Sequence, residues 1–233
     1  MELITILVMS IIILVTLAIL IKFNFKSIKQ IKEIGESREL NSITNVLPEN
    51  EQICKEILAI IKNENVTIKA GNENSQTSLY IVATNSIIIA NIKNTCARVQ
   101  TIAHECIHSI QSKRLLWFNF IFSNIYLMYF AVITILVLFN KLPNASSYAI
   151  VLVMMSILLF FVRSYIETDA MIRARFLAEV YMKSKRELIS EENIDLVVEN
   201  YDKINDFGVK LYNFKLLFDY LLKVVIFCVV SMV

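Results

Sequence analysis

The chain has 233 residues, of which 56% are hydrophobic, and its mean hydropathy of +0.59 is too high for an ordinary soluble domain. A formal net charge of only +2 gives no basis for nucleic acid binding. Because the sequence has only three glycines and two prolines, we expect long uninterrupted helices, and so a mainly α, integral membrane protein.

The first predicted element is a membrane anchor. Leu3 to Ile21 is a run of nineteen residues that is long and apolar enough to span a hydrocarbon core. No positive charge precedes it and no small-residue cleavage site follows it, so we expect it to be retained rather than cleaved as a signal peptide. Residues 1–22 are therefore assigned to an N-terminal transmembrane anchor.

Residues 23–116 are predicted to form a small α+β segment. Glu51 to Asn63 has helical periodicity. Val66 to Ala70, Ser78 to Ala83 and Ser86 to Ala90 read as strands of a small sheet. The strands either serve packing alone, or an exposed edge strand receives an extended peptide by β-addition.

The next predicted helix carries the most informative motif of the chain, His104-Glu105-Cys106-Ile107-His108, which holds its only two histidines. Residues four apart share a helix face, so both imidazoles can reach one metal ion, and Glu105 can address a metal-bound water. Cys106 points to another face and is expected to be a small core residue.

The flanks of this helix are polar. We expect it to be capped by Asn94 or Thr95 and to run to about Lys113, so it is not itself transmembrane. Trp117 marks the start of the next apolar stretch. The motif is therefore expected near a membrane surface rather than within the bilayer.

Residues 117–163 are predicted to form a transmembrane hairpin. Its spans are Phe118 to Phe139 and Tyr148 to Val162, and a short turn containing Pro143 joins them. Residues 164–213 follow as a second polar, helical segment. The C-terminal stretch 214–233 is expected to be transmembrane or interfacial, which gives about four transmembrane helices.

Asp219 and Lys223 interrupt this last stretch at a spacing that allows them to pair on the helix surface. Elsewhere the basic residues show a strong bias, because 21 of the 23 Lys and Arg residues lie in or at the edges of the two polar segments, twelve from Lys22 to Arg114 and nine from Arg163 to Lys215. The positive-inside rule then places these segments in the cytoplasm and the N-terminus outside.

The four cysteines follow no paired spacing, so we expect free thiols, in a reducing compartment or in lipid-facing helices: Cys54, Cys96, Cys106 and Cys228.

Two histidines do not complete a catalytic zinc site, which usually has three protein ligands. Without a third histidine, the best candidates are Glu167 and Asp169, at the start of the second polar segment. The hairpin should bring them to the same membrane face as the motif. They lie about 200° apart on a helix, so one is expected to bind the metal, while the other orients a histidine or pairs with Arg173.

These features resemble the YugP-type neutral zinc metallopeptidases of bacterial membranes: HExxH followed by Ile110-Gln111, a downstream ExDA from Glu167, an N-terminal anchor and a hydrophobic hairpin. The resemblance covers about residues 50–185. It implies a zincin-like unit with one zinc ion on His104, His108 and Glu167 and with Glu105 as base. The chain departs from the family at Ile107, where glycine is common, and over 71–77.

The sequence thus predicts a multi-pass zinc endopeptidase of the bacterial cell membrane that cleaves a membrane-associated peptide or protein. Candidate oxyanion or substrate contacts are Tyr165, Arg173 and Arg175. Three alternatives stay open: an HtpX-like or prenyl-protease-like membrane metallopeptidase, a non-catalytic adaptor stapled by zinc, and a transporter suggested by the Asp219/Lys223 pair. The oligomeric state and the cleavage sequence are left open.

Overall fold

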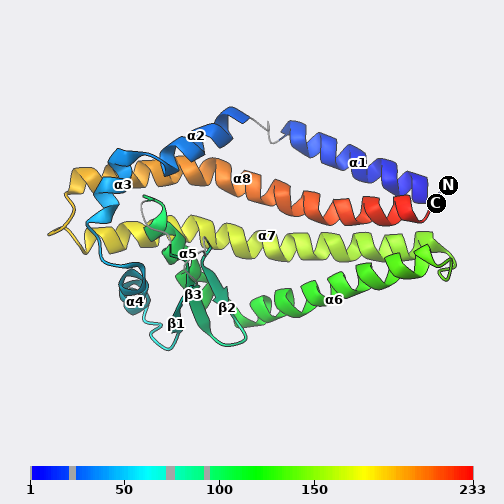
Figure 1. The fold of residues 1–233 in the computed structure, drawn as a ribbon, viewed down its shortest axis with the longest axis horizontal. Helices are drawn as coiled ribbons and strands as arrows, with labels where there is room; N and C mark the ends of the chain where they lie inside the picture. Colours follow the sequence, from blue (N-terminus) through cyan, green and yellow to red (C-terminus); the bar gives the residue numbers. More distant parts are fainter. Residues whose placement is uncertain (1, 21–24, 72–76, 92–94, 233) are drawn as a thin grey trace. The chain divides into compact units, whose positions relative to one another are not determined.

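The computed structural model describes residues 2–20, 25–71, 77–91 and 95–232 of the chain. Over these residues the protein is mainly helical, with a small three-stranded sheet (Figure 1). The described elements are, in chain order, α1 (Glu2–Leu20), α2 (Phe25–Gly35), α3 (Arg38–Asn45), α4 (Asn50–Ile60), β1 (Thr67–Ala70), β2 (Leu79–Ile81), β3 (Ser86–Ile89), α5 (Arg98–Ile110), α6 (Lys113–Leu138), α7 (Ala145–Lys183) and α8 (Glu191–Val230).

The chain divides into two compact units. The apolar unit comprises Met1–Phe23, Trp117–Tyr165 and Lys210–Val233, and the polar unit comprises Asn24–Leu116 and Ile166–Val209. Helix α7 contributes its first part to the apolar unit and the remainder to the polar unit, and its sequence has no glycine or proline to interrupt it.

The apolar unit contains helices suited to a bilayer. Among the described residues, three helices are long and apolar enough to cross a membrane, namely α1 over Glu2–Ile19, α6 and α7. Large apolar side chains on these helices are exposed, such as Met128 at 67% and Phe161 at 65%. Exposed apolar faces of this kind suggest association with a membrane, as the composition predicts.

The expected fourth span lies in the last part of α8, and this helix is not among the three candidates. Lys215, Asp219 and Lys223 interrupt it. Lys223 donates to the backbone carbonyl of Asp219 at 3.0 Å rather than to its carboxylate, so the side-chain pair that the spacing allows does not form. The same stretch nevertheless packs with α6 and α7 in the core of the apolar unit, which contains Tyr126, Ile133, Ala149, Leu152, Leu159, Leu216, Tyr220, Val224, Phe227 and Cys228.

The polar unit contains the sheet, whose strand order is β1-β3-β2. Strand β3 pairs parallel with β1 and antiparallel with β2, so β1 and β2 are both edge strands. Helices α4 and α5 pack against this sheet and against each other (Figure 1). The expected helix from Glu51 and all three expected strands are confirmed.

The start of α5 differs from the expectation. Its N-cap is Ala97 rather than Thr95, while Asn94 lies outside the described residues. The preceding turn is held from both sides, because the Cys96 N–H donates to Asn41 Oδ1 at 2.6 Å and the Tyr201 hydroxyl donates to the Cys96 carbonyl at 2.6 Å. The helix therefore begins only after this fixed turn.

Buried Arg98 anchors the first turn of α5 to the helices before it. Its guanidinium donates to Asn50 Oδ1 at 3.0 Å and to the carbonyls of Thr44 and Leu47 at 2.8 and 2.9 Å. Burial lowers the pKa of Arg98, and the negative charge of nearby Glu49 opposes this effect. The residue thus fixes α5, and with it the motif, to α3 and α4.

Replacing Arg98 with methionine should lower the free energy of unfolding by about 2–4 kcal/mol, because the buried Leu47 carbonyl and the Asn50 side chain would lose their donors. Thermal unfolding of the detergent-purified protein measures this loss. Arg186→Met, which removes an exposed pair with Glu191, is the matched control and should change little. Equal midpoints for the two variants would contradict the role given to Arg98.

Candidate metal centre

The motif histidines lie on one face of α5, as their spacing predicts. Most apolar residues of α5 are buried, among them Val99, Ile102 and Cys106, while Ile110 at its end is exposed. This packing leaves His104 and His108 side by side, with their Nε2 atoms 3.0 Å apart and their rings edge to face. His108 is only 8% exposed.

Helix α7 adds a carboxylate to the two rings. Glu167 Oε2 lies 3.4 Å from His104 Nε2 and 3.7 Å from His108 Nε2. The donor atoms of these three residues all lie within 4.8 Å of one another, so the group could hold a metal ion. Of the two candidate carboxylates in α7, Glu167 is the one that joins the histidines.

The charges in this group are strongly coupled. Burial alone would raise the pKa of Glu167, but its hydrogen bonds with His104 and His108 outweigh burial and hold that pKa well below its usual range. Burial alone would lower the pKa of His108, but its contacts with Glu167 and Glu105 raise the pKa overall. Protons and a cation therefore compete for the same nitrogen atoms.

Metal binding at this group should weaken as the pH falls. Because the pKa of His108 is raised, its ring keeps a proton at higher pH than a free imidazole, whose pKa is about 6.5. A bound cation must displace that proton, so affinity should fall about tenfold for each pH unit below the raised pKa. Titration with zinc against a competing chelator at several pH values measures this, and an affinity that does not vary with pH would contradict it.

Glu105 lies next to the group and is not one of its three members. Its side chain is buried, and Oε2 accepts a hydrogen bond from the backbone N–H of Tyr80 in β2 at 2.6 Å. Burial raises the pKa of Glu105, and its contacts with His104 and His108 act in the opposite direction. The carboxylate is thus held in place by the sheet edge and has a raised proton affinity.

A hydrogen bond between Gln111 and Asp169 connects the end of α5 to α7. Gln111 ends α5 in an extended conformation, with φ −66° and ψ 166°. Its amide lies 2.8 Å from His108 Nδ1 and 2.7 Å from Asp169 Oδ2. Asp169 also pairs with Arg173 at 3.3 Å, as one of the two expectations has it, and it reaches His108 only through Gln111.

The other expected contacts do not gather around the histidines. Tyr165 is 64% exposed and precedes Glu167 by two residues, which on a helix separates them by about 200°. Arg173 is bound to Asp169, and Arg175 is bound to Asp202 and Glu179. None of these three residues can therefore be assigned as an oxyanion donor.

Cys106 is buried in the core with its Sγ 3.7 Å from that of Cys54, and all four cysteines are free, as expected.

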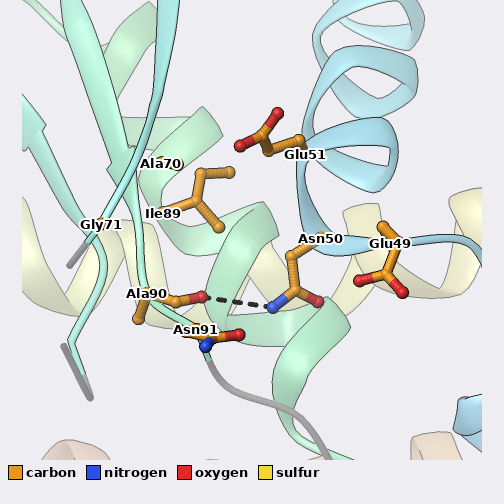
Figure 2. Close-up of a pocket in the computed structure, with 8 residues that line it drawn as sticks. All are labelled: Glu49, Asn50, Glu51, Ala70, Gly71, Ile89, Ala90 and Asn91. Carbon is orange, nitrogen blue, oxygen red and sulfur yellow. Dashed lines mark hydrogen bonds between the residues drawn. The ribbon is translucent and has the colours of Figure 1, made fainter. Parts of the chain in front are cut away.

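The polar unit also contains a pocket of about 400 Å³ (Figure 2). In it the Asn50 side chain donates to the Ala90 carbonyl at 3.2 Å and also accepts from Arg98, so its polar atoms already hold the fold together. The pocket contains none of the motif residues; its lining is Glu49, Asn50, Glu51, Ala70, Gly71, Ile89, Ala90 and Asn91.

Sequence reasoning missed two partners in this centre, Tyr80 and Gln111. A signal existed for Gln111, which follows His108 by three residues and ends the helix, whereas the Tyr80 contact depends on the position of an edge strand. Comparison of the chain with protein-family models, with curated proteins and with solved structures found no match.

Proposed function

We propose that this protein is a membrane-anchored zinc endopeptidase of the YugP type. One zinc ion would be held by His104, His108 and Glu167, with Glu105 as the general base. The observation that carries the proposal is the approach of Glu167, from a helix 59 residues further along the sequence, to the only two histidines of the chain.

The donor set suits zinc. Tetrahedral zinc with bonds of about 2.0–2.1 Å places neighbouring ligand atoms about 3.3 Å apart. The three donor separations of 3.0, 3.4 and 3.7 Å bracket this value. Two imidazoles and one carboxylate are also the ligand set of known zinc peptidases, which leave a fourth position open for water.

A bound zinc ion would supply Lewis acidity, polarising the scissile carbonyl and lowering the pKa of water to about 7. Glu105 would take the proton of the attacking water on its carboxylate and deliver it to the leaving amine nitrogen. The upward direction of its pKa shift favours this role, because a more basic carboxylate takes up the proton of water more readily. The Tyr80 N–H would keep the carboxylate aimed at the site.

A peptide substrate would pair with the edge strand β2, which is the second of the two uses of the strands that the sequence leaves open. Tyr80 lies opposite Ile87 in the antiparallel register, but its N–H donates to Glu105 instead of to β3, so its backbone polar groups face away from the sheet. With this N–H already bound, an incoming strand would use the Tyr80 carbonyl, since the backbone polar groups of Leu79 and Ile81 point towards β3 in this register. The half-exposed side chain of Leu79 would lie beside it.

The basic residues favour a cytoplasmic location for the polar unit, with the N-terminus outside. The substrate would then be a membrane-associated protein of the cytoplasmic face of a bacterial cell membrane. Lys29 and Lys32, which follow α1 on α2, are exposed and carry the charge expected on this side of a span.

The purified full chain, in detergent or nanodiscs, tests this function directly. It should cleave an unfolded protein such as casein, lose that activity when zinc is removed with a chelator, and regain it when zinc is restored. A structural zinc staple predicts no cleavage at any metal loading, and this outcome from correctly folded, zinc-loaded protein would contradict the proposal.

A further inference from the structure

The strongest unassigned feature is the Gln111 side chain, whose amide contacts three groups. Gln111 Nε2 lies 2.8 Å from the Ile166 carbonyl oxygen and 2.7 Å from Asp169 Oδ2, while Oε1 lies 2.8 Å from His108 Nδ1. These distances are those of good hydrogen bonds. The amide therefore joins the helix of the histidines to the helix of Glu167.

The chemistry of these partners fixes the orientation of the amide. A backbone carbonyl and an ionised carboxylate can only accept hydrogen bonds, so the NH₂ group of Gln111 must face them. Its carbonyl oxygen must then face His108 Nδ1 and can only accept from it. His108 must therefore carry a proton on Nδ1, which in a neutral ring leaves the lone pair on Nε2.

We infer that Gln111 is a positioning residue that holds His108 in the tautomer required for metal binding, with Asp169 holding Gln111 in turn. The inference rests on the metal site of the proposed function, and it says how the His108 ring of that site is held ready for a metal ion. The Nε2 atom whose lone pair is freed is the one that lies beside His104 and Glu167.

The same amide positions the third ligand. Its two acceptors, Ile166 and Asp169, lie on either side of Glu167 in the sequence of α7. Gln111 thus links the ring of His108 directly to the backbone that carries Glu167. By contrast, no hydrogen bond to Nδ1 of His104 is seen within the described part of the chain, and the side chain of His104 is twice as exposed as that of His108, at 20% against 10%.

A reciprocal exchange of the two side chains tests this arrangement. In Gln111→Glu the new carboxylate would face Asp169 and the Ile166 carbonyl, and all three groups can only accept. Adding Asp169→Asn would restore a donor, because the amide introduced at position 169 could donate to one carboxylate oxygen while His108 donates to the other. Gln111→Met removes the amide and keeps its approximate size, and Gln52→Met removes an exposed amide–carboxylate bond to Glu56 as the matched control.

Zinc affinity, measured on the full chain by competition with a chelator, should fall about 10-fold to 100-fold in Gln111→Met and in Gln111→Glu. The double variant Gln111→Glu/Asp169→Asn should recover most of this loss, and Gln52→Met should bind like the wild type. The visible spectrum of the cobalt-loaded protein should shift in the two single variants and return in the double variant. A substitution that merely destabilised the chain would not be rescued in this way, and the tautomer of His108 separates positioning of the ring from a structural link between α5 and α7.

A second readout needs neither zinc nor activity. The chain has only two histidines, so ¹⁵N NMR of histidine-labelled, metal-free protein reports two rings, which His104→Asn assigns. At a pH where the rings are neutral, His108 should be protonated on Nδ1 in the wild type and should become a mixture of tautomers in Gln111→Met. An unchanged tautomer together with unchanged zinc affinity in Gln111→Met would overturn the inference and leave the peptidase proposal standing. Zinc-loaded wild type that cleaves no peptide would overturn the peptidase proposal alone.

Discussion

Replacing Glu105 with glutamine should lower kcat/KM for peptide cleavage by about 100-fold to 10,000-fold, the usual contribution of a general base. The amide cannot accept the proton of the attacking water. Its oxygen can still accept the Tyr80 N–H, so the local structure should persist. Zinc content should also persist, because Glu105 is not a member of the donor group. Steady-state cleavage rates and metal analysis of the same preparation measure both effects.

Glu192→Gln is the matched control for this variant, because it makes the same chemical change at an exposed site in the first turn of α8. It should retain full activity. Full activity in Glu105→Gln would contradict the assignment of the base. Loss of zinc along with activity would mean that Glu105 supports the metal site rather than the proton transfer.

Replacing Glu167 with alanine should weaken zinc binding by more than about 100-fold. Loss of a residue that only hydrogen-bonds a metal ligand typically weakens binding by about 10-fold to 100-fold, and loss of a ligand should cost more. The variant removes one of three protein donors and leaves the two imidazoles alone. Because Glu167 also raises the pKa of His108, that pKa should fall towards its ordinary value, and the remaining weak binding should then depend less on pH near neutrality. Chelator competition at two pH values measures both effects.

Glu199→Ala controls for loss of a carboxylate from the polar unit, since Glu199 forms an exposed pair with Lys203. It should bind zinc like the wild type. If Glu167→Ala bound zinc with undiminished affinity, the third ligand would have to be another group, and the assignment based on the geometry of α7 would be wrong.

The sequence predicted the parts of this site that depend on local periodicity. The spacing of His104 and His108 determines that they share a face of α5, and alternating β-branched residues predicted the strands that flank it. The choice between Glu167 and Asp169 could not be made from helix geometry alone. It depends on how α7 is rotated against α5, which is set by packing between segments far apart in the sequence.

The contacts that sequence reasoning missed are tertiary contacts. Tyr80 reaches Glu105 only because β2 is an edge strand with its N–H turned away from β3. The local sequence around Arg175 gives no sign of a partner, so it is a candidate oxyanion donor from sequence alone. In the structure its guanidinium is bound by Asp202 at 2.7 Å, and Asp202 comes from α8. The start of α5 also depends on tertiary contacts, since the side chains of Asn41 and Tyr201 bind the backbone of Cys96 in the preceding turn.

Metal analysis of the detergent-purified wild type beside His104→Ala and Glu167→Ala tests the central claim most directly. The claim is that α5 and α7 together form one zinc site. The account predicts about one zinc ion per wild-type chain, the number that three protein ligands and a water would hold, and little zinc in either variant. Wild-type protein without zinc, or variants that retain it fully, would contradict the claim.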